Sequence, residues 1–497
     1  MKRNLQLFLA ATTALGLATA GSAMAEPHTD LTLGMSIEPS GLDPTAAAPV
    51  AIGQVVWQNL FEGLVTIDED GEVQPELATS WEISEDGLTY TFDLRDGVSF
   101  QNGQPFNAET AKFTIDRIIA PDSINGQKSL YAAIENTEAP DSDTLVLHLS
   151  KPSADLLYWL GFPSAVMVEP ESAPENATKP VGTGPFEFAS WKKGNEVTLT
   201  ENDDYWGEAP KLDKVTFRFI ADPQAQAAAL TSGGVDAIPE FTAPELVAQF
   251  ESNNDFDVVI GTTGMEVVAG MNNTKAPFDN VKVRQALMMA IDRQAIIDAT
   301  NAGYGTPIGS HFSPSDAGFE DLSGVLPYDP AKAKDLLAEA GYPDGFSFTM
   351  KVPNRAYAER AAEIMQAYFA QIGVMMTIES SEFPAKWIQD VFKDTNYDMT
   401  IIGHAEPLDI GIYARDPYYF NYSSPDFDAT MAEIANATTE EERLAAYKKA
   451  QEILADDVPA LFLYAWPKIG VWKAGLEGLW TNEPVPSNDV TDVYWSE

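Results

Sequence analysis

The sequence predicts an α/β protein with a segment of short strands in its N-terminal half. Two observations support this class. From residue 271 onwards, apolar residues at helical spacing alternate along the chain with short runs of strand-forming residues. Between Trp81 and Leu149, apolar and polar residues alternate around glycine-containing turns, as in short antiparallel strands. A hydrophobic content of 45% over 497 residues is sufficient for packed cores and argues against a disordered chain.

The first 25 residues have the pattern of a signal peptide. Lys2 and Arg3 are basic, the stretch 5–20 is apolar, and residues 23–25 read Ala-Met-Ala, a small-residue cleavage site. A membrane anchor is the alternative, but the apolar stretch is shorter than the ~20 residues that a spanning helix needs. The chain has no cysteine, so a lipid anchor on an N-terminal cysteine is excluded. We therefore expect a periplasmic protein that is not lipid-anchored.

The N-terminal half is predicted to contain strands with a few helices between them. Alternating apolar residues predict strands at 31–35, 90–94, 145–149, 196–200 and 215–220, and helical spacing predicts helices at 51–60 and 108–119. The run Asp68-Glu69-Asp70-Gly71 has only part of a calcium-loop pattern, because it lacks the third acidic position before the glycine and the distal glutamate. We interpret this run as a hairpin turn.

The C-terminal half has clearer helix boundaries. Apolar residues from Val283 to Ile297 predict a helix capped by Asp279 or Asn280. A second helix begins at the cap Asp329 with Pro330 in its first turn and ends before Gly341. The stretches 346–352, 357–372 and 374–378 read as strand, helix and strand, a βαβ unit. A strand at 397–402, a polar loop at 403–416 and a helix at 441–455 complete the prediction.

Charge and motifs exclude several classes of function. Thirty basic and 75 acidic residues give a net charge of −45, a field that repels nucleic acids and anionic membranes. The four histidines, His28, His148, His311 and His404, lie far apart in sequence, and none belongs to a local paired-ligand motif. We therefore expect neither a metal site nor a cofactor. Phosphate-binding and G-x-S-x-G motifs are absent from the sequence, whereas a hydrolase that uses two carboxylates stays open.

Two polar segments follow strands of the predicted α/β region, where ligands bind in open sheets. Arg355 follows the strand 346–352, and the loop 403–416 follows the strand 397–402. Charged side chains of that loop lie close in sequence to the aromatic residues Tyr413, Tyr418, Tyr419 and Phe420, a composition typical of recognition surfaces. A solvated acidic surface is the alternative for the loop, as a solvated helix start is for Arg355. The candidate binding residues are Arg355, His404, Glu406, Asp409, Tyr413 and Arg415.

Several motifs, in order along nearly the whole mature chain, resemble those of the periplasmic solute-binding proteins that serve dipeptide, oligopeptide and nickel ABC transporters (solute-binding protein family 5). They are Leu77-Ala78-Thr79-Ser80-Trp81, Asp86-Gly87-Leu88-Thr89-Tyr90-Thr91-Phe92-Asp93-Leu94-Arg95, Gly182-Thr183-Gly184-Pro185-Phe186, Asn202-Asp203-Asp204-Tyr205-Trp206, Val283-Arg284-Gln285-Ala286, Ala290-Ile291-Asp292-Arg293, and Tyr328-Asp329-Pro330 with Ala340-Gly341-Tyr342.

The resemblance implies the two-lobed periplasmic binding protein fold, with hinged lobes, the ligand in the interlobe cleft and an extra β-rich subdomain in the N-terminal lobe. The implied division is 26–270 for lobe I, with the β-rich subdomain at about 60–175, then 271–473 for lobe II and 474–497 for a return to lobe I. It also implies that Arg355 clamps the carboxylate of a peptide and that Asp409 or Glu406 pairs with its α-amine.

The sequence departs from the family pattern at two places. Residues 100–103 read Phe-Gln-Asn-Gly where the family often has Phe-His-Asp-Gly, and the loop 403–416 is longer than usual. The expected function is the periplasmic substrate-binding component of an ABC importer, without enzymatic activity, which delivers a small peptide to permease subunits in the inner membrane. An oligosaccharide or opine ligand is the first alternative, and a secreted glycosidase or peptidase is the second. We expect a monomer.

Overall fold

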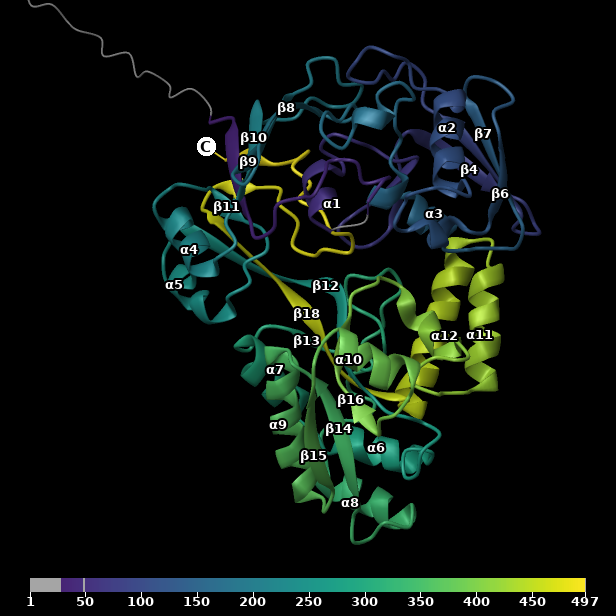
Figure 1. Cartoon of the computed structure of the whole chain (residues 1–497), viewed down its shortest axis with the longest axis vertical. Coiled ribbons are helices and arrows are strands. Elements are labelled where there is room, and N and C mark those ends of the chain that lie inside the picture. Colours follow the sequence, from purple (N-terminus) through teal and green to yellow (C-terminus); the bar gives the residue numbers. More distant parts are fainter. Residues whose placement is uncertain (1–27, 48–49, 497) are drawn as a thin grey trace, which may run out of the picture.

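The computed structural model describes residues 28–47 and 50–496, so the predicted signal peptide lies outside the described residues. Two lobes are stacked along the long axis of the molecule (Figure 1). Two long antiparallel strands, β12 (Phe256–Gly270) and β18 (Ala460–Lys473), pass from one lobe to the other. We call lobe I the body formed by the residues before β12 and after β18, and lobe II the body formed by the residues between them.

The two long strands belong to one sheet that continues through both lobes. Its strand order is β17-β12-β18-β11-β1-β10-β9-β8, with β13 paired to β18. The pairing of β12 with β18 has a register shift between Thr262 and Glu266, where the strands cross from lobe I to lobe II. The lobes are thus joined by two adjacent extended segments. The lobe limits expected at residues 270 and 473 coincide with the ends of these strands, and as domain boundaries they stay predictions.

Lobe I consists of a main body and a β-rich part with its own hydrophobic core. The β-rich part is a four-stranded sheet, in the order β4-β5-β7-β6, which packs on helix α2. Its elements are β4 (Ala78–Ile83), β5 (Thr89–Leu94), β6 (Ile134–Glu138), β7 (Thr144–Leu149) and α2 (Ala108–Ile119), with α3 (Leu156–Leu160) beside them. The predicted helix 108–119 and the strands 90–94 and 145–149 are confirmed.

The main body of lobe I contains the remaining N-terminal elements: β1 (Asp30–Met35), α1 (Val50–Val56), β2 (Val65–Ile67), β3 (Val73–Pro75), β8 (Phe186–Lys192), β9 (Glu196–Glu201), β10 (Lys214–Phe219), α4 (Pro223–Thr231), β11 (Ala237–Ile238) and α5 (Ala248–Glu251). The short pair β19 (Leu476–Glu477) and β20 (Tyr494–Trp495) closes the chain. The helix predicted at 51–60 is too long, because Gln58 adopts a positive φ of 61° that a helix does not accommodate. The predicted hairpin turn at 68–71 is confirmed between β2 and β3.

Lobe II contains the α/β unit that the sequence predicts. Strands β14 (Ser347–Pro353) and β15 (Met375–Ser381) are parallel and are joined by helix α9 (Ala356–Gln371), with β16 (Met399–Thr400) on the other side of β14. The other elements are α6 (Val281–Met289), α7 (Arg293–Asn301), β13 (Thr306–Pro307), α8 (Pro330–Glu339), α10 (Ala385–Trp387), β17 (Ile402–His404), α11 (Pro425–Asn436) and α12 (Glu440–Asp457).

Two predictions in lobe II need correction. The apolar pattern from 283 to 297 is divided into α6 and α7, because the Asp292 carboxylate accepts hydrogen bonds from the backbone N–H groups of Gln294 and Ala295 and starts a new helix. The strand predicted at 397–402 consists of β16 and β17, which pair with different partners, β14 and β12. The cap at Asp329 is confirmed, since its carboxylate accepts from the N–H groups of Ala331 and Lys332.

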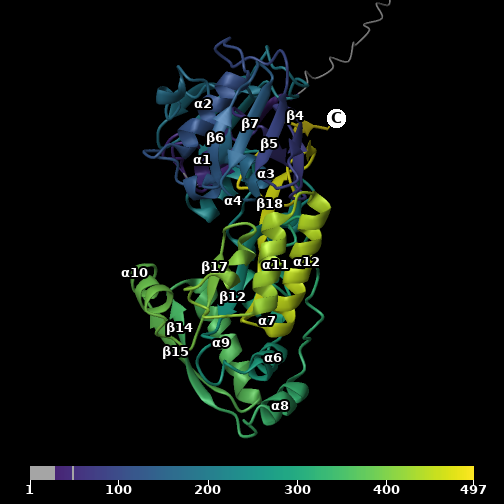
Figure 2. The ribbon, with the colours of Figure 1, turned by 90° about the vertical axis from the view of Figure 1, so that its right-hand side faces the viewer.

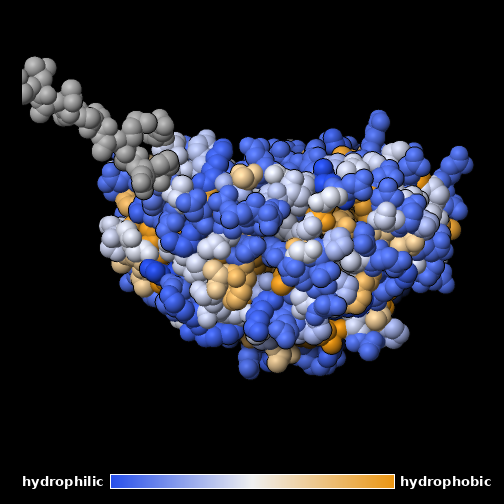
Figure 3. Space-filling view, turned by 90° about the horizontal axis from the view of Figure 1, so that it is seen from above, coloured by the Kyte–Doolittle hydropathy of each residue, from blue (hydrophilic) through white to orange (hydrophobic). Residues whose placement is uncertain are grey.

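The lobes also contact each other beside the hinge strands, where α12 approaches α3 (Figure 2). Asp155 of lobe I accepts a hydrogen bond from the Arg443 guanidinium at 3.0 Å and another from the Tyr447 hydroxyl at 2.8 Å. Seen from the lobe I end, the surface is largely hydrophilic, and its apolar residues form small separate patches (Figure 3). Among the described helices, none combines the length and apolar character needed to cross a bilayer.

Candidate functional site

A cleft of about 550 Å³ lies between the lobes, next to the point where β12 and β18 cross. Residues of both lobes and of the crossing strands line it. Lobe I contributes Val50, Glu240–Thr242, Pro244, Glu245, Glu483, Pro484 and Pro486; lobe II contributes Thr300, Asn301, Arg355–Tyr357, Arg360, Ala405 and Pro407; the crossing strands contribute Thr263–Met265 and Trp466–Ile469. A cavity of this size accommodates a small solute.

The lobe II wall carries two arginines at the start of α9. Arg355 directly precedes the helix and follows β14, and Arg360 lies in the helix's second turn. Both side chains are exposed, and neither forms an ion pair with a described residue. The Arg355 guanidinium lies 4.9 Å from the centre of the Phe383 ring, which holds it against the lobe surface. This wall therefore offers positive charge to the cleft.

Aromatic side chains lie beside these arginines. The Tyr357 ring packs edge to face on Trp466, with ring centres 5.5 Å apart, and the Tyr357 hydroxyl accepts a hydrogen bond from the backbone N–H of Gly403 at 2.9 Å. Burial raises the pKa of the Tyr357 hydroxyl. Trp466 belongs to β18 and so places an apolar surface at the crossing of the two strands.

The lobe I wall is acidic. Glu240 and Glu483 line the cleft with Lys468, and the Gln54 amide donates a hydrogen bond to the Glu240 carboxylate. Burial, with a contribution from the neighbouring Glu240, raises the pKa of the Glu483 carboxyl well above its ordinary value. Burial also lowers the pKa of Lys468, whose ammonium group donates to the Trp480 carbonyl at 2.6 Å. Two carboxyl groups accompany one amine here, and Glu240 offers its carboxylate to a cationic group of a ligand.

Of the six residues predicted to bind ligand, Arg355 lines the cleft, and the other five do not. His404 and Tyr413 are buried behind the wall, and the Asp409 side chain, 9% exposed, lies between His311 and His404, at 2.6 Å from His311 Nε2 and 3.2 Å from His404 Nδ1. Glu406 and Arg415 are exposed on the loop, and the Arg415 guanidinium lies 5.7 Å from the centre of the Tyr418 ring. The loop reaches the cleft through Ala405 and Pro407.

The six residues thus do not share the single crevice that was expected. One lines the cleft, three belong to a cluster behind its wall, and two are exposed on the loop. The reason is that the histidine and tyrosine side chains draw Asp409 into the interior of lobe II, which chain order does not reveal. A direct role of these residues in ligand binding stays a prediction.

Sequence reasoning missed Arg360, Glu240, Lys468, Glu483 and Trp466. Arg360 had a local signal, because it lies in the predicted helix that follows Arg355. The other four come from segments that meet only in the folded protein.

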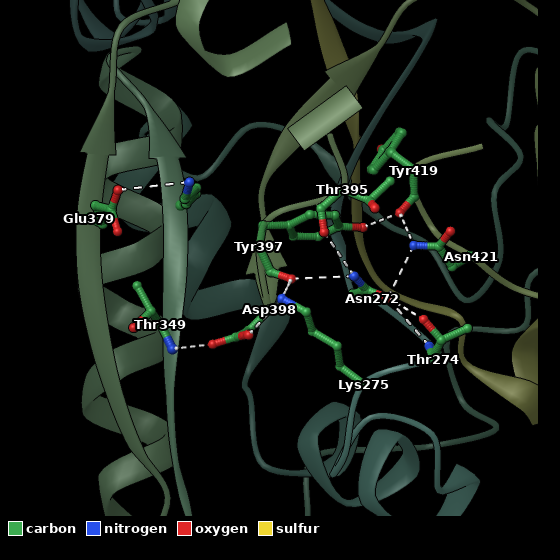
Figure 4. A network of polar contacts seen from close by, with 11 residues as sticks. Asn272, Thr274, Lys275, Thr349, Glu379, Thr395, Tyr397, Asp398, Tyr419 and Asn421 are labelled. Atoms are coloured by element: carbon green, nitrogen blue, oxygen red, sulfur yellow. Dashed lines mark hydrogen bonds and ion pairs between the residues drawn. The ribbon is translucent and has the colours of Figure 1, made fainter. Parts of the chain in front are cut away.

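A second polar network holds the far end of the 403–421 segment (Figure 4). The buried Asn272, just after β12, donates to the carbonyls of Thr395 and Tyr397 at 3.1 and 3.4 Å and accepts from the Asn421 amide at 3.1 Å. The Tyr397 hydroxyl donates to the Tyr419 carbonyl at 2.5 Å. The segment that carries Ala405 and Pro407 is therefore fixed at both ends.

Comparisons with known proteins agree with this architecture. The family model described as bacterial extracellular solute-binding proteins, family 5 Middle, matches residues 72–430. The glutathione-binding protein GsiB of Salmonella typhimurium is 33% identical over 490 residues, covering 94% of this chain and 95% of that protein.

Solved structures match over almost the full chain. HbpA2 from Haemophilus parasuis is 26% identical, with a TM-score of 0.87 over 94% of this chain and 100% of that one. The periplasmic binding protein DppA from Helicobacter pylori, in complex with the peptide STSA, is 28% identical, with a TM-score of 0.70 over 95% of this chain and 99% of that one. The predicted two-lobed fold is confirmed.

Proposed function

The chain belongs to family 5 of the bacterial extracellular solute-binding proteins, the periplasmic solute-binding components of ABC importers, and we propose that its ligand is a short peptide with free charged termini. The observation that carries this proposal is the opposite charge of the two cleft walls. Arg355 and Arg360 face the cleft from lobe II, and Glu240 and Glu483 face it from lobe I.

A peptide has the matching groups. Its carboxylate pairs with the Arg355 guanidinium, which offers several N–H donors in one plane, and its ammonium group pairs with the Glu240 carboxylate. Because the wall carries two arginines, it can also pair with a second carboxylate of the ligand. Peptides with net negative charge are therefore the first candidates. Glutathione is such a peptide, and the 33% identical relative is named for binding it.

Binding of such a ligand between the walls favours closure of the lobes, because only the closed arrangement lets both walls contact it. The comparisons support a different angle between the lobes here than in the peptide complex of DppA. The peptide complex of DppA and HbpA2 have nearly equal identity and coverage, yet the TM-scores are 0.70 and 0.87. A lower score over the same elements is what a different angle between lobes produces.

Several finer features of the proposed function rest on the sequence. The protein is released into the periplasm after removal of residues 1–25, without a lipid anchor, and delivers its ligand as a monomer to the permease subunits of its importer. It does not hydrolyse the ligand. The family model and the 33% identical relative are binding proteins, which supports this.

Calorimetry on the mature protein, freed of copurified ligand, tests the ligand class. The panel contains glutathione, dipeptides and tripeptides, the same peptides with blocked termini, disaccharides and opines. We expect binding of free peptides and weak or no binding of blocked ones. Binding of disaccharides or opines alone would contradict the peptide proposal and leave the importer role intact, and release of cleavage products over time would contradict the role as a pure binding protein.

Arg355→Ala tests the charged wall. Removing one partner of a desolvated charge pair costs about 2–5 kcal/mol, so peptide affinity should fall roughly 30- to 4,000-fold. Lys332→Ala is the control, because Lys332 is an exposed cation of lobe II that does not line the cleft. The melting temperature of the unliganded protein should be nearly the same in both variants. Unchanged affinity in Arg355→Ala would exclude Arg355 as the carboxylate clamp.

Glu240→Gln tests the opposite wall. The amide keeps the size of the side chain and removes its charge, so free peptides should bind more weakly while N-acetylated peptides lose little. An equal loss for both kinds of peptide would show that Glu240 does not recognise the ammonium group.

A further inference from the structure

We propose that His311, His404 and Asp409 bind a divalent transition-metal ion of the Zn²⁺ class inside lobe II, behind the wall of the cleft. One donor atom from each of the three residues can be chosen so that all lie within 4.8 Å of one another. The residues come from two separate segments, the one around His311 and the loop with His404 and Asp409, and His311 and Asp409 are 98 residues apart. No metal site was expected because the histidines lie far apart in sequence, whereas the fold brings two of them together.

The donor set suits such an ion. Neutral imidazole nitrogens and a carboxylate oxygen are ligands that Zn²⁺ and neighbouring first-row metals accept, with a fourth position open for water. His311 uses Nε2 and His404 uses Nδ1 toward Asp409, each facing a different oxygen of the carboxylate, Oδ1 and Oδ2 respectively. One ion bound to these atoms would replace the direct contacts between the two rings and the carboxylate.

The other nitrogen of each ring has its own hydroxyl partner. Tyr413 Oη lies 3.2 Å from His311 Nδ1, and Tyr419 Oη lies 2.8 Å from His404 Nε2. Metal-binding histidines are oriented in this way, with the second ring nitrogen hydrogen-bonded to a neighbouring group. The Tyr419 backbone is itself held by the network around Asn272 (Figure 4). The rings are therefore set in position before any ion binds.

The surroundings favour positive charge. Glu266 and Asp316 are each only 2% exposed, and each has a buried carboxylate oxygen without a hydrogen-bond partner among the described residues. Glu266 pairs with His404 across β12 and β17. In the described part of the chain, no lysine or arginine forms an ion pair with Glu266, Asp316 or Asp409. A divalent ion supplies the charge that such a buried acidic region otherwise lacks.

The site would brace the cleft without contacting the ligand. Asp409 and His404 flank Ala405 and Pro407, which line the cleft, and the Ser313 hydroxyl near His311 donates to the Thr263 carbonyl of the crossing strand at 2.5 Å. An ion would thus tie the loop to the segment around His311 next to the hinge. This inference rests on the buried cluster alone and is independent of the identity of the cleft ligand.

The experiment uses the untagged mature protein, treated with EDTA and dialysed, with Zn²⁺ as titrant in calorimetry and Co²⁺ as a spectroscopic probe. We expect one Zn²⁺ per chain, a higher melting temperature with Zn²⁺, and visible Co²⁺ absorption bands. Asp409→Asn should weaken Zn²⁺ binding more than about 100-fold, and Tyr419→Phe, which removes only the hydroxyl at His404, should weaken it about 10- to 100-fold. Tyr419→Phe keeps the fold testable if Asp409→Asn is unstable.

His148→Gln is the matched control, because His148 lies on the surface of the β-rich sheet and pairs with Glu138. It should leave Zn²⁺ affinity, stoichiometry and the Co²⁺ spectrum unchanged. The proposal is overturned if the folded parent protein binds neither ion, or if binding is the same in Asp409→Asn and Tyr419→Phe as in the parent. The cluster would then be a hydrogen-bonded network only.

Discussion

At the scale of one residue, the buried acid Glu62 explains why the motif at residues 202–206 contains a tyrosine and a tryptophan. Its carboxylate is 1% exposed and accepts hydrogen bonds from the Tyr205 hydroxyl at 2.7 Å and the Trp206 indole N–H at 2.8 Å. The motif Asn202-Asp203-Asp204-Tyr205-Trp206 therefore supplies the two donors of a buried acid, and the Arg95 guanidinium lies 4.4 Å from the centre of the Trp206 ring. Even so, burial raises the pKa of Glu62 from 4.5 to about 7.

This raised pKa predicts a pH dependence of stability. Between pH 4.5 and about 7 the folded protein keeps a proton on Glu62 that the unfolded chain has released. The contribution of Glu62 to the free energy of unfolding is therefore fully present below pH 4.5 and is lost as the pH rises to about 7. The Glu62→Gln variant lacks this titration, so up to about 3 kcal/mol of the pH-dependent loss in the free energy of unfolding should disappear. The stability of the variant relative to the parent should therefore increase as the pH rises.

Urea denaturation of parent and variant at several pH values from about 5 to 8 measures this effect. Glu85→Gln, at an exposed position, is the control and should follow the parent at every pH. A stability difference between Glu62→Gln and the parent that is constant with pH would contradict the assignment.

At the scale of elements, local signals predicted those helices and strands whose ends are marked by capping residues, prolines or glycines. The helix that begins after Asp329, the βαβ unit from β14 to β15, and the helix α12 were all evident from caps, glycines and apolar spacing. The long strands β12 and β18 were not predicted. They pair with each other across 190 to 217 positions of sequence, and no local spacing encodes that pairing.

The segment after β12 depends on one buried side chain. Asn272 is 2% exposed, and its amide joins the strand end to residues 395–397 and 421. Asn272→Ala leaves buried donors and acceptors without partners, so the free energy of unfolding should fall by about 1–3 kcal/mol. Urea denaturation measures it.

Asn436→Ala is the control for this prediction, because the Asn436 amide is exposed at the end of α11 and bonds only within its own helix. Asn436→Ala should lower the free energy of unfolding much less than Asn272→Ala does. Equal losses would mean that the network of Figure 4 adds nothing beyond an ordinary surface hydrogen bond.

At the scale of the whole molecule, net charge dominates the behaviour in solution. Seventy-five acidic residues against 30 basic ones leave a charge of −45, and self-repulsion of that charge destabilises a compact chain. Raising NaCl from about 20 mM to about 0.5 M screens the repulsion, so the melting temperature at neutral pH should rise. Near the isoelectric point of about 4.2 the same salt step should raise it much less. A melting temperature that falls with salt at neutral pH would show that attractive ion pairs outweigh the repulsion.

The sequence by itself determined the fold class, the family and the position of Arg355, because strand and helix periods, caps and ordered motifs are local properties of the chain. The lobe boundaries and the signal peptide remain predictions of the same kind. Only the tertiary structure decided what faces the cleft and what lies behind it. Glu240 and Glu483 meet across 243 positions of sequence, and His311 meets Asp409 across 98. Such pairs depend on how β12 and β18 bring distant segments together and on which side chains burial then draws inward, and neither is encoded in the spacing of neighbouring residues.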